Sequence, residues 1–396
     1  MEACHCDLCS ANDFDVVRMD RWNAPDGSHW YPVLTCLCNR CGHVFNNPTL
    51  TYSEIKAFYQ GQKRESFQVA RGESKGLNAA DVEHLTSLTG PGNRRRALEI
   101  GCYTGYLSSR LIKAGWQVEG LEPNPESAQK ARELHGIKVH ESLFEYYQPK
   151  ASYDLIFLGG VLEHVRSPTN FLLRINQQLS LQGLAYIRVP RLDDLGYDTA
   201  ADLFILEHLH NFSAAAMSML LEKTGFQLLD SHVHKRFPRS FVSIARKIAH
   251  CDTPKPFTIT SQTDRLRADI QAYSAIVEHQ RARLDAIFQA LALETPPPRT
   301  AVYGVGSHTD MLMQHTLMNQ LHITAVIDSN PSKHGELAFG HTVQNPEQLD
   351  LSQIDAVVIS SRAFQEEIYQ RIQHWEQRGV KLIRLYDLTQ SRYAHE

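Results

Sequence analysis

Between residues 97 and 250, short apolar runs alternate with amphipathic segments. Apolar runs of about four to eight residues bounded by turns are typical of buried strands, and they are found at 97–102, 117–123, 138–142, 153–161 and 183–190. The intervening segments place apolar residues at steps of three and four, which predicts helices, at 105–115, 126–136 and 167–179. This alternation predicts an α/β fold with a doubly wound parallel sheet. Two further strands, 226–233 and 240–247, are expected to close the sheet as a hairpin at its edge.

One long helix is predicted over residues 262–294. Its apolar side chains recur at steps of three, four and seven, like the seam of a coiled coil, and they are Leu266, Ile270, Tyr273, Val277, Leu284, Ile287 and Leu291. Ser261 and Asp264 form a capping box at its start, and Gln280 interrupts the seam. Such a seam packs either against neighbouring domains or against a second copy of the chain. We therefore expect a monomer or a homodimer.

The stretch "TPPPRT" at 295–300 breaks the chain, and a second alternation of strands and helices follows it. This pattern predicts a smaller, separate Rossmann-like domain. Gly304 and Gly306 follow its first strand, and Asp328 ends its second strand. These residues suit either a second nucleotide site or a degenerate fold that forms one wall of a substrate cleft.

Composition and charge narrow the class of protein. A chain of 396 residues with 42% apolar and 21% charged residues is typical of a globular protein with two or three domains. The net charge of −4 and the absence of a Lys/Arg run give no field that favours nucleic acid. No apolar run approaches the ~20 residues that span a bilayer, and the N-terminus lacks the features of a secretory signal. The expected location is the cytoplasm, without nucleic-acid or membrane partners.

Six of the eight cysteines stand in two C-x-C-x-x-C stretches, "CHCDLC" and "CLCNRC". In a reducing compartment, two C-x-x-C pairs at this separation indicate a tetrahedral Zn²⁺ site. The best placed thiols are Cys6, Cys9, Cys38 and Cys41. Cys4 and Cys36 have alternative spacings and could each replace a neighbouring cysteine as a ligand, and His5 and His43 are weaker ligand candidates. The other interpretation of the clustered cysteines is a set of free thiols. Four thiolates leave no open coordination position, so we expect a structural ion.

The stretch "ALEIGCYTGYL" carries the clearest chemical signal. Glu99 ends a strand, Gly101 follows it, and Gly105 opens the next helix. Glycines at this place let the backbone approach a ligand at the carboxyl ends of the strands. The spacing G-x-x-x-G does not match the dinucleotide fingerprint. Glu122 ends the next strand, where its carboxylate is placed to accept hydrogen bonds from a ribose diol.

These residues resemble the class I S-adenosylmethionine-dependent methyltransferases, whose signature E-x-G-x-G-x-G is matched at Glu99, Gly101 and Gly105, with Tyr103 in place of the middle glycine. The resemblance implies S-adenosylmethionine as the cofactor. It also implies an adenine site near Leu143 and Phe144, and backbone near the cofactor at the fourth strand. The implied cofactor-binding residues are Glu99, Gly101, Cys102, Tyr103, Gly105, Glu122, Pro123, Leu143, Phe144, Gly159 and Gly160.

The order of parts also resembles the zinc-containing nucleotide-sugar C-methyltransferases of deoxysugar biosynthesis. "YGVGSHTDMLM" is similar to their C-terminal domain, and "FILEHLHNF" lies where the family has Y-H-E-H-L, with Glu207 and His208 retained and the family's Tyr and first His replaced. The resemblance implies a zinc-binding module at 1–55, a Rossmann-like methyltransferase core at 56–250, a linker helix at 251–298 and a Rossmann-like C-terminal domain at 299–396.

The narrower resemblance implies methylation of a carbon next to a keto group on a nucleotide-linked sugar. That reaction needs a base, and His208 with Glu207 are the candidate catalytic residues; the other interpretation of His208 is a loop hydrogen bond. His164 is a weaker candidate. Tyr59, Tyr103, Tyr106 and Arg188 are further candidate pocket residues, with core or surface positions as the other interpretation. Residues 61–76 are either a loop or a mobile lid, and the basic stretch 234–240 is either a diphosphate contact or a solvated loop.

Two other functions remain open from the sequence. An O- or N-methyltransferase acting on another small molecule or a peptide would use the same cofactor site without a carbon-acid base. A zinc-ribbon protein that modifies nucleic acid is disfavoured, because the first 50 residues hold only Arg18, Arg21 and Arg40 as basic side chains.

Overall fold

The computed structural model describes residues 1–23, 29–55, 79–90, 95–193, 195, 203–235, 238–260 and 262–386. The chain divides into two compact units. Of the described residues, the first contains those between Met1 and Ile270, and the second contains those from Gln271 onwards.

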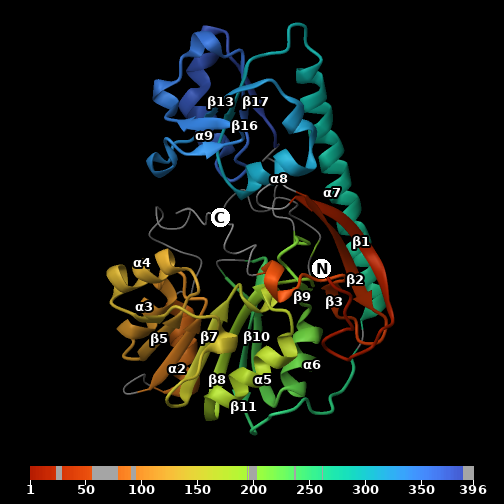
Figure 1. The fold of residues 1–396 in the computed structure, drawn as a ribbon, viewed down its shortest axis with the longest axis vertical. Coiled ribbons are helices and arrows are strands. Elements are labelled where there is room, and N and C mark those ends of the chain that lie inside the picture. Colours follow the sequence, from red (N-terminus) through yellow and green to blue (C-terminus); the bar gives the residue numbers. More distant parts are fainter. Residues whose placement is uncertain are drawn as a thin grey trace. The chain divides into compact units, whose positions relative to one another are not determined.

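A seven-stranded sheet forms the centre of the first unit, in the order β10-β11-β8-β7-β4-β5-β6 (Figure 1). Its strands are β4 (Arg96–Ile100), β5 (Gln117–Leu121), β6 (Lys138–His140), β7 (Tyr153–Gly159), β8 (Leu179–Pro190), β10 (Phe226–Val233) and β11 (Ser240–Lys247). The pairs β4–β5, β4–β7, β5–β6 and β7–β8 are parallel. β11 is antiparallel to both β8 and β10. The α/β prediction is confirmed for this unit, with β10 as the outer strand of the predicted hairpin.

Helices cover both faces of this sheet. They are α2 (Ala79–Thr89), α3 (Tyr106–Lys113), α4 (Pro125–His135), α5 (Pro168–Gln178) and α6 (Ala214–Lys223). The side chains of Asn124, Ser167 and Ser213 cap the starts of α4, α5 and α6 by accepting backbone N–H bonds. Such caps satisfy N–H groups that have no partner inside the helix.

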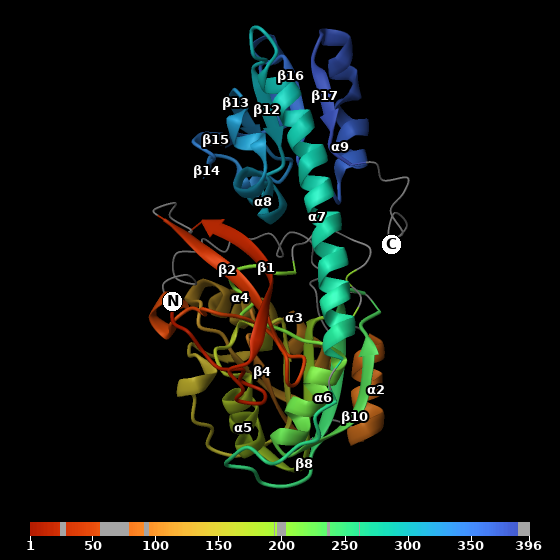
Figure 2. The same ribbon diagram turned by 90° about the vertical axis from the view of Figure 1, so that its right-hand side faces the viewer.

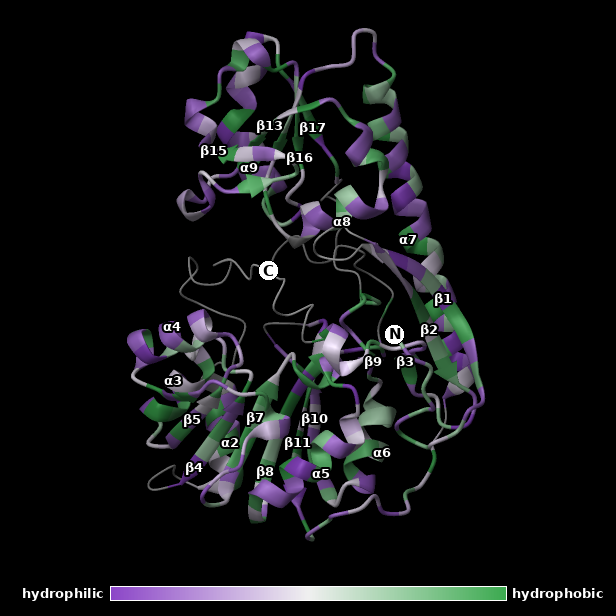
Figure 3. Cartoon of the chain, viewed as in Figure 1, coloured by the Kyte–Doolittle hydropathy of each residue, from purple (hydrophilic) through white to green (hydrophobic). Residues whose placement is uncertain are grey.

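Two apolar layers separate the sheet from its helices. On one face, Leu85 of α2 and Leu111 of α3 pack with Phe157 of β7. On the other face, α5 and α6 belong to the cluster that includes Leu98 and Ile156. Figure 3 shows β7 and β8 largely in hydrophobic colours, as expected for strands covered on both faces.

The N-terminal module has its own four-stranded sheet, in the order β1-β2-β3-β9. β1 (Phe14–Asn23), β2 (Trp30–Cys38) and β3 (Val44–Asn46) come from the module, whereas β9 (His210–Asn211) comes from a much later part of the chain. Val44 pairs with Asn211 and Phe45 with His210. Residues 52–55 are helical. The module is thus joined to the core by backbone pairing.

The second unit contains a six-stranded sheet in the order β14-β15-β13-β12-β16-β17. The parallel strands are β12 (Thr300–Tyr303), β13 (Ile323–Ile327), β15 (His341–Gln344), β16 (Ala356–Ile359) and β17 (Lys381–Arg384), and β14 (Leu337–Ala338) is antiparallel. Its helices are α8 (Ser307–His315) and α9 (Gln365–Ile372). The predicted alternation of strands and helices is present, and the Rossmann-like assignment of this unit stays a prediction.

Short 3₁₀ helices connect the larger elements. In the first unit they are η1 (Phe144–Tyr146) and η2 (Leu162–His164). In the second unit they are η3 (Leu317–Gln320), η4 (Pro331–Lys333), η5 (Pro346–Gln348), η6 (Leu351–Gln353) and η7 (Gln373–Arg378). The helix η2 carries two of the residues considered below as functional candidates.

The predicted long helix is α7 (Thr263–Ala292), which is unbroken in Figure 2. Of the seven predicted seam residues, six are buried and Ile287 is partly buried. Leu284 and Leu291 pack in the core of the second unit beside Phe288, which the sequence pattern had not included. Ser261, one half of the predicted capping box, lies outside the described residues. Within the described part of the chain, no helix combines the length and apolar character needed to cross a bilayer.

Candidate functional site

The glycine loop after β4 needs glycine at both of its glycine positions. Gly101 and Gly105 have φ angles of 71° and 76°, in the left-handed region. A Cβ on Gly105 would lie 2.3 Å from Ile137 Cδ1, and one on Gly101 would lie 2.7 Å from Val161 Cγ2. The loop after β4 therefore lies directly against the segment that follows β7.

Tyr103 stands where the related methyltransferases have their middle glycine. Its φ of 47° is also left-handed, a conformation that costs a non-glycine residue roughly 1–2 kcal/mol. The backbone N–H of Tyr103 donates to Glu122 Oε2 over 2.9 Å. The loop therefore keeps the backbone path of a glycine although the residue has changed.

Glu122 is aimed by the backbone around it. Its side chain is buried, with 3% of the residue exposed. Oε2 accepts the N–H of Tyr103 and Oε1 accepts the N–H of Asn124, each over 2.9 Å. These two amide donors orient the carboxylate at the end of β5, beside the glycine loop, where the sequence predicts a ribose acceptor. The position predicted from the sequence thus fits the ribose of S-adenosylmethionine.

Glu99 makes a structural contact with the next helix. Its Oε2 accepts the backbone N–H and the hydroxyl of Ser108 on α3, over 3.0 and 2.5 Å. Burial raises the pKa of this carboxyl to about 8, against the effect of the bonds from Ser108. Glu99 therefore anchors the start of α3 and positions the loop, and no sequence signal had pointed to Ser108 as its partner.

The remaining predicted cofactor residues divide into core and surface positions. The Cys102 side chain packs among Ala128, Ala131 and other apolar residues below the loop, so it offers only its backbone to a ligand. Phe144 is also buried, at 4.8 Å between ring centroids from Phe171. Leu143 is 41% exposed and can reach a ligand. Pro123 is exposed beside Glu122.

Gly159 and Gly160 end β7 beside Arg188 of β8. A Cβ on Gly159 would lie 2.9 Å from Arg188 Nη2, so the glycine makes room for the guanidinium. Gly160 has a φ of 73°, and its N–H donates to the carbonyl of Arg188 over 3.0 Å. The sequence had named Arg188 as a possible pocket residue, and the structure places it next to these two predicted glycines.

Three polar side chains meet just beyond β7. Glu163 and His164 come from η2, and His208 comes from the segment before β9; one ligand atom from each lies within 4.8 Å of the others. The ring centroids of His164 and His208 lie 5.0 Å apart. Because this segment contacts Gly101 through Val161, the cluster lies beside the glycine loop. Sequence reasoning had named both histidines and missed Glu163.

Burial controls the protonation of this cluster. It lowers the pKa of His208 to about 4, with the neighbouring His164 adding to the effect, so His208 is neutral at pH 7. Burial raises the pKa of Glu163 to about 7. The Nδ1 atom of His208 lies 2.7 Å from the carbonyl of Leu203, so the predicted loop hydrogen bond of this histidine is present as well.

Glu207 contributes through its backbone and its side chain. Its carbonyl accepts from Nδ1 of His164 over 2.8 Å. Its half-buried carboxylate lies close enough to influence the protonation of both Glu163 and His208. The two residues predicted as catalytic, Glu207 and His208, therefore lie in one cluster with Glu163 and His164.

The four predicted zinc ligands converge, and the two alternative cysteines do not join them. The sulfurs of Cys6 and Cys41 lie 3.6 Å apart, those of Cys9 and Cys38 lie 3.5 Å apart, and all four are mutually within 4.8 Å. A tetrahedral site with Zn–S bonds of about 2.3 Å separates its sulfurs by about 3.8 Å. The thiols therefore fit Zn²⁺ with modest adjustment.

Cys4 and Cys36 instead bond backbone carbonyls. Cys4 Sγ lies 3.8 Å from the carbonyl of Asn46, and Cys36 Sγ lies 3.7 Å from that of Leu34. Burial raises the pKa of each thiol to about 11. Neither thiol belongs to the group of four sulfurs that lie within 4.8 Å of one another.

The first cysteine turn is fastened to the core by Asp7 and Lys223. Asp7 accepts bonds from the Ser167 hydroxyl over 2.6 Å and the Thr169 N–H over 2.8 Å, at the start of α5. Lys223 Nζ donates to the carbonyls of Asp7 and Leu8 over 2.9 and 2.8 Å. His43 Nε2 and His210 Nδ1 form a further link of 2.9 Å. These contacts indicate a structural role for the module, as expected from its closed ligand set.

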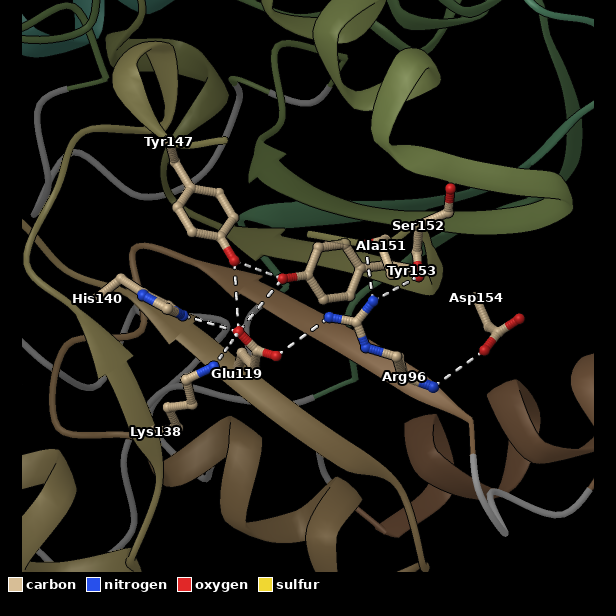
Figure 4. A network of polar contacts seen from close by, with 9 residues as sticks. All are labelled: Arg96, Glu119, Lys138, His140, Tyr147, Ala151, Ser152, Tyr153 and Asp154. Carbon is tan, nitrogen blue, oxygen red and sulfur yellow. Dashed lines mark hydrogen bonds and ion pairs between the residues drawn. The ribbon is translucent and has the colours of Figure 1, made fainter. Parts of the chain in front are cut away.

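A polar network holds β5 in place, and Figure 4 shows it. Glu119 receives bonds from His140 Nε2 over 2.7 Å, Arg96 Nη2 over 3.1 Å and Lys138 Nζ over 3.2 Å. Burial alone would raise the pKa of Glu119, but these three donors hold it at about 2. Glu119 stands three positions before Glu122, so the network fixes the strand that presents the ribose candidate.

In the second unit, Asp328 has a position that resembles that of Glu122. It accepts the N–H groups of Val305 and Asn330, each over 2.8 Å. It also pairs with Nζ of the buried Lys333 over 3.0 Å. Because the charge of Asp328 is balanced inside the fold, the geometry favours the interpretation of a degenerate nucleotide fold here.

Other predicted residues have local partners or lie outside the described part of the chain. Tyr106 accepts a bond from Arg110 over 2.6 Å on α3. Tyr59, the loop 61–76 and residues 236–237 of the basic loop lie outside the described residues.

Comparison with known proteins assigns two segments of the chain. A family model described as "Methyltransferase domain" matches residues 75–231. A model described as "C2185-like, N-terminal" matches residues 298–383.

The similar proteins are methyltransferases of several kinds. A ubiquinone biosynthesis O-methyltransferase of Rickettsia canadensis is 26% identical over 37% of this chain and 69% of its own length. A tRNA U34 carboxymethyltransferase of Shewanella sp. (strain ANA-3) is 33% identical over 24% of this chain, and one of Klebsiella pneumoniae (strain 342) is 32% identical over 37%. The chain spans 31% and 46% of the lengths of these two tRNA enzymes.

Among solved structures, a Burkholderia thailandensis 1,6-didemethyltoxoflavin-N1-methyltransferase with bound S-adenosylhomocysteine covers 52% of this chain and 96% of its own, at 16% identity and a TM-score of 0.40. An S-adenosylmethionine-dependent methyltransferase of Mesorhizobium loti covers 43% of this chain and 98% of its own, at 16% identity and a TM-score of 0.36. Both TM-scores lie below 0.5, so neither likeness carries an argument about this chain.

The family match and the geometry of the first unit agree. The matched segment contains the glycine loop, Glu122 and the Glu163 cluster, and its sheet is the doubly wound sheet predicted from the sequence. Residues 75–231 therefore match a methyltransferase domain, and this segment contains the glycine loop that the sequence predicts as an S-adenosylmethionine site.

Proposed function

We propose that the chain transfers a methyl group from S-adenosylmethionine to a carbon beside the keto group of a nucleotide-linked sugar. The observation that carries the proposal is the meeting of Glu163, His164 and His208 beside the glycine loop, with Glu207 in the same cluster. Transfer to carbon needs an acidic C–H to be ionised, and this cluster offers candidate bases for that step.

The cofactor supplies a methyl carbon bonded to a positively charged sulfur. The chain would hold its ribose at Glu122 and its adenine near Leu143, with the backbone of Gly101 allowing close approach. Anchoring at these points aims the methyl group at the acceptor, and fixed orientation supplies much of the rate enhancement of such a transfer.

The acid–base cluster would prepare the acceptor. His208 and the Glu207 carboxylate are the candidate bases, and His208 is neutral at pH 7 because its pKa is lowered to about 4. A keto oxygen that becomes an enolate needs a positively charged or hydrogen-bonding partner. The guanidinium of Arg188 lies beside Gly159 and close enough to Glu163 to affect its protonation, so it is one cationic group near the cluster.

The sugar class rests on the narrower family resemblance. Glu207 and His208 match the retained part of the family stretch, and their place in the cluster supports the shared chemistry. We also propose a structural Zn²⁺ at Cys6, Cys9, Cys38 and Cys41, supported by the converging sulfurs.

The acceptor is tested with isotopically labelled S-adenosylmethionine and a panel of substrates. The panel contains nucleotide-linked 4-keto sugars, the corresponding hydroxy sugars, a catechol and a tRNA pool. We expect labelled product with a 4-keto sugar, with the label on carbon by NMR. Turnover of another class without turnover of any nucleotide sugar would reject the sugar assignment.

A second test separates C-methylation from O- or N-methylation. Replacing His208 by Ala should remove activity while leaving S-adenosylhomocysteine binding intact, because His208 lies outside the cofactor anchors. Full activity of His208→Ala would favour a transfer to oxygen or nitrogen.

A further inference from the structure

The cluster beyond β7 has the composition of a metal site as well as that of an acid–base site. Glu163 and His164 lie on η2, and His208 lies 44 positions after His164 in the chain. One oxygen or nitrogen from each lies within 4.8 Å of the others. The four cysteines form a separate group made only of thiols.

Both imidazoles are oriented by a hydrogen bond from Nδ1 to a backbone carbonyl. His164 Nδ1 lies 2.8 Å from the carbonyl of Glu207, and His208 Nδ1 lies 2.7 Å from that of Leu203. A carbonyl only accepts, so each Nδ1 carries a proton, and in the neutral form of each ring Nε2 is the acceptor atom. Histidines that bind metals typically have this second bond to a carbonyl or carboxylate, which fixes the ring.

One oxygen of the buried Glu163 carboxyl, Oε2, lacks a hydrogen-bond partner within the described residues. The residue is 2% exposed. Its Oε1 lies 3.8 Å from His164 Nε2, which is longer than a hydrogen bond. A buried polar atom without a partner is costly, so the arrangement calls for a cation between the carboxylate and the rings.

We propose that Glu163, His164 and His208 bind a divalent transition-metal ion. Imidazole and carboxylate together suit ions such as Mn²⁺, Fe²⁺, Co²⁺ and Zn²⁺, and two histidines with one carboxylate are a recurrent set that keeps coordination positions open. Ligand atoms that each lie about 2.1 Å from an ion are about 3 Å from one another. Side-chain rotations that shorten the distances between the three ligand atoms by roughly 1–2 Å would therefore complete the site. Both histidines are half-buried, which leaves a side for an oxygen ligand.

The role of the ion, unlike its binding, rests on the proposed function. An acceptor's keto oxygen would take an open position, and the ion would stabilise the enolate. His208 would then be a ligand, leaving the Glu207 carboxylate to take the α-proton. The enolate carbon forms a bond to the methyl carbon as the bond from methyl to sulfur breaks. The electron pair stays on sulfur, giving neutral S-adenosylhomocysteine, and Glu207 later returns its proton to water.

The test uses the full chain loaded with one equivalent of Zn²⁺, which the four thiolates bind in preference to the Glu163 cluster, with unbound zinc removed. Mn²⁺ is titrated in and followed by the electron paramagnetic resonance of the free ion, with total metal measured after dialysis. We expect one Mn²⁺ per chain in addition to the zinc. Changes of surrounding residues typically weaken metal binding 10- to 100-fold, so Glu163→Gln and His208→Ala, which remove ligands, should weaken Mn²⁺ binding more than about 100-fold.

A matched control and a second spectroscopic measurement secure the interpretation. His250→Ala removes a histidine whose side chain is 60% exposed, and it should bind Mn²⁺ like the parent. Co²⁺ added to the zinc-loaded chain should give the weak visible bands of nitrogen and oxygen ligation, without the intense thiolate bands. Since this measurement needs no variant, it stands even if a substitution disturbs folding.

The outcomes separate this inference from the proposed function. Absence of any Mn²⁺ or Co²⁺ beyond the cysteine site overturns the inference, as does equal Mn²⁺ affinity in the parent and in folded Glu163→Gln. S-adenosylhomocysteine binding is titrated on the same samples without turnover. If the parent protein does not bind S-adenosylhomocysteine, the proposed function is contradicted. If it binds S-adenosylhomocysteine but no second metal ion, only the metal site is contradicted.

Discussion

Replacing Glu122 by Gln tests the geometry of the ribose site directly. Each carboxylate oxygen accepts one backbone N–H over 2.9 Å, from Tyr103 or from Asn124. In the variant, one oxygen becomes an NH₂ group that faces a backbone N–H, so two donors oppose each other. The side-chain amide of the variant must then rotate away from that backbone N–H or leave its position. The negative charge that would accept a hydrogen bond from a ribose hydroxyl is also gone.

The expected loss follows from the bond types involved. A hydrogen bond to a charged group contributes about 1.5–3 kcal/mol, compared with about 0.5–1.5 kcal/mol for a neutral one. Losing one charge-assisted bond to the ribose should therefore raise the Kd for S-adenosylmethionine roughly 10- to 150-fold. S-adenosylhomocysteine has the same ribose, so its Kd should rise by the same factor.

Isothermal titration calorimetry with both ligands measures the effect, and circular dichroism checks that the variant is folded. Glu126→Gln is the matched control, because it makes the same change of charge four positions later on a side chain that is 72% exposed. It should leave both Kd values within about twofold of the parent's, as expected for a surface substitution. A folded Glu122→Gln variant whose Kd values for both ligands stay within about threefold of the parent's would show that Glu122 does not hold the ribose. Such a change is smaller than the one expected from losing a charge-assisted hydrogen bond.

Three further substitutions probe the fold around the site. Gly105→Ala adds a Cβ at 2.3 Å from a neighbouring side chain and forces a left-handed φ of 76° on alanine; it should lower the free energy of unfolding in urea by roughly 2–5 kcal/mol. Gly136 has a φ of 64° and open space around a Cβ, so backbone strain alone should lower the free energy of unfolding of Gly136→Ala by ~1–2 kcal/mol. Equal losses of unfolding free energy in the two glycine variants would contradict the packing argument. Glu119 has a pKa of about 2 in the fold and 4.5 as its ordinary value, so its stabilisation is present above pH 4.5 and is lost as the pH falls towards 2. The unfolding free energies of Glu119→Gln and the parent should therefore converge by about 1–2 kcal/mol over that window, after allowance for solvent screening, and a pH-independent gap would refute the assignment. Lys223→Met removes two bonds to the first cysteine turn and should speed the release of zinc to a chelator, whereas the exposed Lys130→Met should release it at the parent's rate.

The sequence predicted those features that depend on local pattern. Left-handed glycines, strand ends and cysteine pairs each leave a signature within a few residues. The glycine loop, Glu122 and the convergence of the four cysteines could therefore be located from the order of residues alone. The buried seam of α7 was also predicted from its periodicity, although Phe288 replaces Ile287 as the more deeply buried residue at that turn.

The features that were missed depend on contacts between distant segments. Glu163 stands beside His164 in sequence, but only the fold shows that its carboxyl is buried and faces His208. Asp7 and Lys223 look like ordinary surface residues, and their link spans 216 positions. Position in the chain likewise could not show that Phe144 and the Cys102 side chain pack into the core, because turns place exposed and buried side chains next to each other.

The pairing of β3 with β9 has a consequence for how the chain is made. The cysteine turns are complete once the first 41 residues have left the ribosome, and they can capture zinc then. His43 must wait for His210, 167 positions later, before its sheet is finished. During that interval the short strand β3 presents an unpaired edge, the kind of surface on which nascent chains associate wrongly. The module would thus stay a half-closed template while 167 of the 396 residues are made, and it is completed only when the segment that carries His208 and His210 emerges.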